Sequence, residues 1–270
     1  MKPLRNVLLA LAAVVALAPL VWMAETSLKS NREITQDGTL YPHGPTFANY
    51  RSLFSGRSFG SYLTNSIGIT ALSVLISLVL GSLAAYAIAR YRLRFNLERH
   101  IGVGLLTLRI LPPIVIIVPA FLIVERFGLL NTWLGLIVIY SAFNVSFVVW
   151  MMESFFREIP VDLEEAAMVD GDSRFTAFRR IVLPLARPGL AATAIFAVIV
   201  TYNEFLFALV LTSTPDAETM PVGAATLIGR INVDWGAMSA AGIVGAVPIV
   251  VFALIVQRHL VRGLTMGAVK

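Results

Sequence analysis

The sequence predicts an all-α, polytopic membrane protein, and three observations carry that prediction. Of the 270 residues, 57% are hydrophobic and only 14% are charged, whereas an ordinary soluble domain has about 25% charged residues. The mean hydropathy is +0.80. Six segments are each long and apolar enough to cross a hydrocarbon core of ~30 Å, which takes about 20 helical residues at ~1.5 Å each.

We expect these six segments to be the spans of one transmembrane domain that fills residues 1–270. The predicted spans are 7–24, 64–89, 101–124, 129–152, 188–212 and 236–256. The first could be mistaken for a secretory signal, because Lys2 and Arg5 precede it and residues 16–18 mimic a cleavage site. Pro19 follows directly and should block cleavage, so we expect a retained span.

The distribution of Lys and Arg predicts the orientation of the chain. With the amino terminus inside, the inner segments hold 14 of the 21 cations and the outer segments hold 6, while Arg109 lies within a span. Inner loops of membrane proteins carry the excess of positive charge. The sequence therefore predicts a multi-pass membrane protein with both termini in the cytoplasm.

Nothing in the sequence indicates catalysis by this chain alone. It has no G-x-x-x-x-G-K-[ST] phosphate loop for ATP and no cysteine for thiol chemistry. The three histidines, His43, His100 and His259, are far apart and predict no metal site. The acidic pairs have no water-excluding pocket beside them that would suit acid/base chemistry. We expect no cofactor on this chain.

Between the fourth and fifth spans lies a charged loop, residues 160–184, in an otherwise apolar chain. Pro160 ends the preceding helix, and Asp162 with Glu165 three residues later forms a capping-box pattern. A helix is expected to start at Leu163. Gly171 stands where a left-handed residue would end this helix, because glycine has no Cβ penalty there.

A second short helix is expected to begin after Ser173 as its cap and to run toward Pro184. The charged loop could be an amphipathic surface element that merely links two spans. A sequence pattern favours a different interpretation. Glu165-Ala166-Ala167, three residues, Gly171, nine residues, and then Ile181-x-Leu183-Pro184 resemble the EAA loop of the permease subunits of bacterial ABC importers.

The resemblance extends over nearly the whole chain. The stretches "PTFANYRSLF", "FFREIPVDLEEAA", "LPLARPGLAATAIF", "YNEFLFAL" and "GLTMGAVK" are similar to segments of the maltose-type (MalG-like) branch, which carries sugars and related polyols. Tyr202 departs from relatives that often place Trp before Asn-Glu-Phe, although Tyr keeps an aromatic body with a polar tip.

The resemblance implies a machine with several partners in a bacterial or archaeal cytoplasmic membrane. These are a second, different permease subunit, two ATPase subunits that hold ATP and Mg, and an extracytoplasmic sugar-binding protein, with no role for nucleic acid. It implies that the EAA loop is a coupling helix that docks on the ATPase. The residues expected to dock are Glu164, Glu165, Ala166, Ala167, Asp170 and Gly171, with Glu165 as the first choice for the docking charge.

Polar residues within the spans are the candidates for the translocation pathway. They are Arg109, Asn144, Tyr202, Asn203 and Glu204. Sugars are bound by planar hydrogen-bonding groups and aromatic faces, which these side chains supply. Hydrogen bonding between helices is an alternative role, and for Asn144 it is at least as plausible.

Two alternatives to a sugar permease stay open. The same machine could import an unrelated solute such as an amino acid or phosphate. A channel or structural membrane protein that works without ATP would need pore-lining rings or a symmetric motif, and neither is visible.

Overall fold

A computed structural model describes the backbone of residues 2–37, 39, 41–91, 100, 102, 104, 107, 111–229 and 233–266, and the side chains of this set except 2–3, 37 and 257–266. Within these ranges the fold is all-α, as predicted, and the extended pairing is confined to a bridge between Ile228 and Val233. The helices are α1 (Lys2–Ser27), α2 (Ala48–Gly56), α3 (Phe59–Arg90), α5 (Pro113–Arg126), α6 (Trp133–Glu158), α7 (Asp162–Val169), α8 (Arg174–Ala177), α9 (Leu183–Leu185), α10 (Arg187–Tyr202), α11 (Leu206–Leu211), α12 (Met220–Ala225) and α13 (Trp235–Met266).

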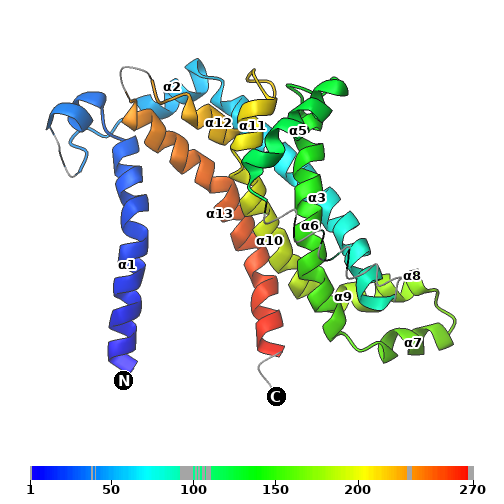
Figure 1. Ribbon diagram of the computed structural model, residues 1–270. Helices are drawn as coiled ribbons and strands as arrows, with labels where there is room; N and C mark the ends of the chain where they lie inside the picture. Colours follow the sequence, from blue (N-terminus) through cyan, green and yellow to red (C-terminus); the bar gives the residue numbers. More distant parts are fainter. Residues whose placement is uncertain are drawn as a thin grey trace.

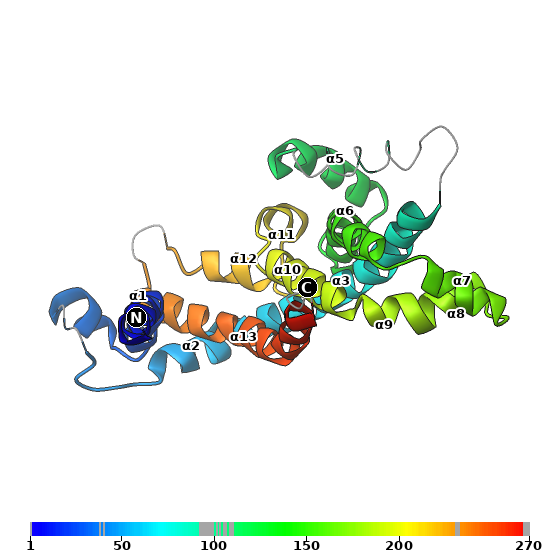
Figure 2. The ribbon, with the colours of Figure 1, turned by 90° about the horizontal axis from the view of Figure 1, so that it is seen from below.

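The long helices run between two ends of the molecule (Figure 1). The short helices α2, α11 and α12 lie at one end, and α7, α8 and α9 project from the other, which we call the loop end. The start of α1 and the last turns of α13 also lie toward the loop end. Seen from below, α1 and the α7–α8 projection are on opposite sides of the body (Figure 2).

The packing of α3 against α6 is the most extensive contact between helices. It is possible because α3 carries small buried residues on this side, such as Ser73, Ser77 and Gly81, which lie against Ser141 and Val148 of α6. The Ser77 hydroxyl donates to the Ser73 carbonyl at 2.6 Å and lies 3.2 Å from the Ser141 carbonyl of α6. Membrane helices pack by such close approach, since lipid tails remove the hydrophobic drive between them.

Four described helices are long and apolar enough to cross a membrane, and a bent pair raises this to five. The four lie within α1, α3, α6 and α13 and overlap the first, second, fourth and sixth predicted spans. The third predicted span is described only in part, because most of residues 101–110 fall outside the described set. The count of six spans stays a prediction.

The fifth predicted span, 188–212, is not one continuous helix. The structure divides it into α10 and α11, with a break at residues 203–205. A break inside a membrane is tolerated only where other groups bond the released backbone N–H and C=O. Here the carboxylate of Glu204 does so, and hydropathy alone carries no signal for such a break.

The charged loop folds as the two short helices that its sequence predicts. Gly171 has φ +95°, the left-handed conformation expected between them, and the Ser173 hydroxyl accepts from the backbone N–H of Thr176 at 3.2 Å. The predicted cap at Asp162 is wrong: α7 begins at Asp162 itself, after Val161, with no side-chain cap. Because the backbone of Val161 is already helical, Asp162 enters the first turn, where its charge suits the helix dipole.

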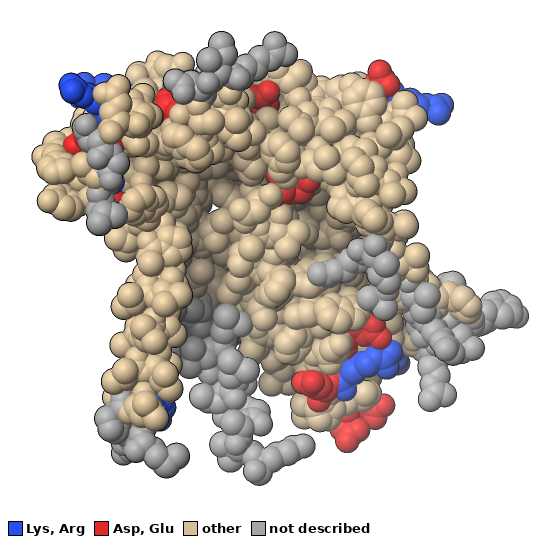
Figure 3. Space-filling model, turned by 60° about the vertical axis from the view of Figure 1, so that its left-hand side comes forward, with Lys and Arg blue, Asp and Glu red and all other residues tan. Residues whose placement is uncertain are grey.

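A space-filling view shows how charge is distributed on one face (Figure 3). Charged side chains gather near the two ends of the molecule, and a broad uncharged belt lies between them, interrupted by an acidic group. This is the arrangement expected of a body that sits in a bilayer, since charge within the hydrocarbon is costly.

Candidate functional site

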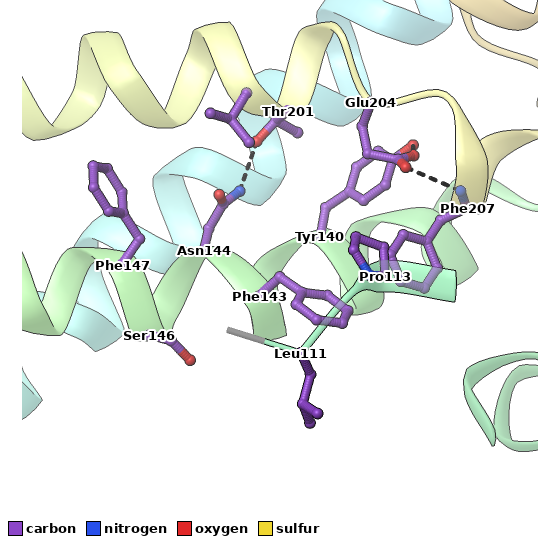
Figure 4. A pocket seen from close by; sticks show the side chains of 11 residues that line it. Leu111, Pro113, Tyr140, Phe143, Asn144, Ser146, Phe147, Thr201, Glu204 and Phe207 are labelled. Atoms are coloured by element: carbon purple, nitrogen blue, oxygen red, sulfur yellow. Dashed lines mark hydrogen bonds between the residues drawn. The ribbon is translucent and has the colours of Figure 1, made fainter. Parts of the chain in front are cut away.

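A cavity of about 230 Å³ opens at the break between α10 and α11, facing α6. Its walls are mostly aromatic and aliphatic, with a few polar groups among them (Figure 4). The lining residues are Leu111, Pro113, Tyr140, Phe143, Asn144, Ser146, Phe147, Val200, Thr201, Glu204 and Phe207. Apolar walls with a few convergent polar groups are typical of small-molecule sites, although such sites usually enclose about 300–1,000 Å³.

Glu204 is the charged group of this cavity, and its carboxylate accepts three hydrogen bonds. The backbone N–H groups of Phe207 and Ala208, in the first turn of α11, donate at 3.0 and 3.3 Å. The Tyr140 hydroxyl donates at 2.7 Å. A carboxylate offers about four lone-pair positions, so about one acceptor position is left. Glu204 therefore holds the break in shape while it lines the cavity.

Asn144 lies on the same wall of α6 as Tyr140, because residues four apart share one face of a helix. Its amide donates to the Thr201 hydroxyl of α10 at 2.6 Å, and its side chain is buried (Figure 4). This bond is the helix-to-helix role that the sequence leaves open for Asn144. The contact and the cavity are compatible, since the amide carbonyl retains its acceptor positions.

Two other predicted pathway residues, Tyr202 and Asn203, do not line this cavity. Tyr202 is buried, and its hydroxyl makes no hydrogen bond within the described part of the chain. Asn203 is exposed, and its amide donates to the carbonyl of Ile199 in its own helix. Arg109 lies outside the described residues.

Sequence reasoning missed Tyr140, Thr201 and the phenylalanines of the cavity. Tyr140 and Phe147 stand four residues before and three after Asn144, so helical spacing from Asn144 could have found both. Phe207 could not be found in this way, because its position depends on the break that precedes α11.

The projecting loop presents a second candidate site. Glu165, Ala166, Asp170 and Gly171 are exposed on it. Apolar side chains accompany them, with Val169 87% and Phe175 65% exposed. Exposed apolar groups mixed with charges are typical of protein interaction sites.

Glu164 and Ala167, both predicted to dock, are buried instead. Consecutive residues of a helix point about 100° apart, so Glu164 turns toward the body while its neighbour Glu165 turns outward. The Arg90 side chain pairs with Glu164, and the Tyr86 hydroxyl donates to it, each at 2.5 Å. The Glu164 carboxylate therefore faces the body of its own chain.

Known proteins match this chain in sequence along most of its length. A family model described as "Binding-protein-dependent transport system inner membrane component" matches residues 77–266. The trehalose transport system permease protein SugB of Mycobacterium tuberculosis is 44% identical over 257 residues, 94% of this chain and 93% of that protein. The trehalose/maltose transport system permease protein MalG of Thermococcus litoralis is 36% identical over 263 residues, 96% of this chain and 94% of that protein.

A solved structure matches the fold. It is a crystal structure of a bacterial ABC transporter involved in the import of the acidic polysaccharide alginate. The alignment covers 95% of each chain with a TM-score of 0.79 and 24% identity. Identity at this level supports a shared fold and nothing about the solute.

Proposed function

The chain belongs to the family of inner membrane components of binding-protein-dependent transport systems, and from this premise we propose that it forms half of the pathway of an importer for a sugar. It is a transmembrane subunit of an ABC importer and not itself an enzyme. The observation that carries the solute class is the near full-length similarity to permeases named for trehalose and for trehalose/maltose.

The cavity between α6 and α10 supports a sugar as the solute. Tyr140, Phe143 and Phe207 supply aromatic faces, and Asn144 and Glu204 supply planar hydrogen-bonding groups. Aromatic faces suit the C–H surface of a sugar ring, and the planar groups suit its hydroxyls. The cavity is smaller than most ligand sites, which is consistent with a half-site that a second permease completes.

The projecting loop is the proposed docking element for an ATPase subunit. Glu165 and Asp170 would fix the docked register through charge, and Ala166 would allow close approach. Glu164 is left out of this docking surface because it is buried against Arg90. With one such loop, the chain engages one ATPase, so a complete importer would need a second permease and a second ATPase.

The proposed assembly contains this chain, a related but different permease, two ATPase subunits and an external sugar-binding protein. The loop end would face the cytoplasm, where the ATP is, and the start of α1 and the last turns of α13 lie toward that side. Purification from native membranes should recover the partners together. A stable homo-oligomer that transports sugar without them would contradict this assembly.

The substrate proposal is tested by ATP hydrolysis. The complex is reconstituted in lipid with its binding protein, and hydrolysis is measured with trehalose, maltose, diacetylchitobiose, methionine or phosphate. We expect one of the sugars to raise the rate above that with the unloaded binding protein. Stimulation by methionine or phosphate, and by none of the sugars, would show that the machine imports another class of solute.

A further inference from the structure

A buried ionic cluster ties α7 to the end of α3. The side chains of Arg90 and Glu164 are 5% and 6% exposed. The Nε of Arg90 and the hydroxyl of Tyr86 each donate to the Glu164 carboxylate at 2.5 Å, one to each oxygen. A second nitrogen of Arg90, Nη2, donates to the carbonyl of Ile159 at 2.9 Å. One guanidinium thus bonds both the residue that follows α6 and the first turn of α7.

Ring contacts around the cluster also join the loop to the end of α3. The ring of Tyr86 lies 4.6 Å from that of Phe178, in the segment after α8, and 6.0 Å from that of Phe156 on α6. The guanidinium of Arg174, the first residue of α8, lies 5.5 Å from the centre of the Tyr91 ring at the end of α3. Both short helices of the loop therefore contact the end of α3.

Stability alone does not explain a buried ion pair. Removing two charges from water is costly, and well-packed apolar residues of similar volume often hold a fold as firmly. The distinguishing property of this cluster is its geometry, because the planar guanidinium fixes the direction of each hydrogen bond. The cluster holds the first turn of α7 and the carbonyl of Ile159 against the end of α3.

The covalent route from the loop to α10 is bent. The segment Arg174–Leu185 meets α10 (Arg187–Tyr202) at 74°. On the carboxyl side of α7, a movement that travelled along the chain would have to pass this corner; on the amino side, the chain joins α6 through residues 159–161. The Arg90 cluster offers a direct route to α3, and through the α3–α6 contact to the wall of the cavity.

We propose that Tyr86, Arg90 and Glu164 are positioning residues that make α7 and α3 move as one unit, so that movement of the docked ATPase reaches the pathway through α3. This rests on the proposed function. The two adjacent glutamates then have different roles: Glu165 faces the ATPase subunit, and Glu164 faces the body of its own chain. We call the three residues the latch.

The first test measures distance in the complete importer. The chain has no native cysteine, so spin labels can be placed at Leu163→Cys on α7 and Leu83→Cys on α3, both exposed and outside the latch. We expect one narrow distance distribution that is the same without nucleotide and after trapping with ATP and vanadate. A wild-type distance that changes between these states would overturn the proposal.

The variants then separate the latch from general stability. Arg90→Glu and Glu164→Arg should each broaden the distribution, and the double variant, which restores opposite charges, should narrow it again. Arg90→Lys keeps the charge but not the planar fork, so it should broaden the distribution in a complex that assembles normally. The matched control is Glu153→Arg, which breaks an exposed ion pair with Arg157 on the same end of α6; it should change nothing.

The functional readout is trehalose taken up per ATP hydrolysed in proteoliposomes. We expect the single latch variants to lower this ratio about tenfold, within the about 5- to 150-fold typical of coupling between sites, and the double variant to recover it. A narrow distribution in Arg90→Lys, or a double variant as broad as the single ones, would overturn the latch. Failure of the proposed function would look different, since the wild-type complex itself would then take up no trehalose, maltose or diacetylchitobiose when supplied with ATP.

Discussion

At the break between α10 and α11, the Glu204 carboxylate accepts from two backbone N–H groups of Phe207 and Ala208 and from the Tyr140 hydroxyl. Glu204→Ala leaves the two N–H groups without this acceptor, and an unsatisfied buried group costs about 1–3 kcal/mol. We therefore expect the Glu204→Ala variant to have a lower Tm than wild type in detergent, measured by tryptophan fluorescence. Tyr140→Phe removes only one donor and should lower the Tm less. Equal stability of Glu204→Ala and wild type would show that the break does not need this carboxylate.

The exposed Glu165 is the residue whose charge we expect to matter for docking. Reversing one member of a desolvated charge pair typically costs about 2–5 kcal/mol in binding, so Glu165→Lys should weaken binding of the ATPase and abolish most transport. Glu158→Lys is the control, since Glu158 is exposed at the end of α6, just before the loop. Copurification of the ATPase measures the effect. Loss of binding in both variants alike would mean that net charge, and not position 165, decides docking.

Among the elements, the turn between α7 and α8 depends on Gly171, whose φ is +95°. A Cβ there would meet nothing within 4 Å, so the cost of Gly171→Val comes from the backbone conformation. That cost is about 1–2 kcal/mol per residue, and we expect reduced ATP-driven transport from a chain that still inserts. Gly44→Val, also in open space but without positive φ, is the control. If both variants transported equally, the loop would be an ordinary linker.

The close contact between α3 and α6 leads to a prediction about packing. A Cβ on Gly81 would lie 2.6 Å from Cγ1 of Val148, which is fully buried. Gly81→Ala should therefore cost about 1–3 kcal/mol by overpacking, seen as a lower Tm, and Val148→Ala in the same chain should recover part of it. Gly60→Ala, in the same helix but with its nearest neighbour atom at 3.9 Å, should be neutral. If the double variant had the same Tm as Gly81→Ala, the lost stability would not come from a clash with Val148.

The sequence was informative about elements where the signal is local. Hydropathy predicted α1, α3, α6 and α13, and short-range patterns predicted Gly171 and the Ser173 cap. It could not predict features that depend on residues far apart in the chain. The break near Glu204 depends on Tyr140 from another helix, and the burial of Glu164 depends on Arg90, 74 residues away. Two adjacent glutamates look alike in sequence, and only the helix phase relative to α3 separates their roles.

The whole molecule combines a small cavity, a projecting loop and the latch that joins the loop to α3. These features are what we expect of one subunit of a larger complex. The cavity is smaller than typical ligand sites, and the apolar residues of α1 are exposed. Both features suit a chain that works among lipid and partner subunits. We therefore expect transport to require the complete complex.

The most direct test of the central claim is uptake of a radiolabelled sugar, the one that stimulates ATP hydrolysis, into proteoliposomes that contain the complete complex, with ATP trapped on the side of the ATPase and the sugar-binding protein on the other. The account predicts uptake of the sugar against its concentration gradient. This uptake stops when ATP or the sugar-binding protein is omitted. Flux that continues unchanged without ATP would contradict it, because the chain would then act as a channel.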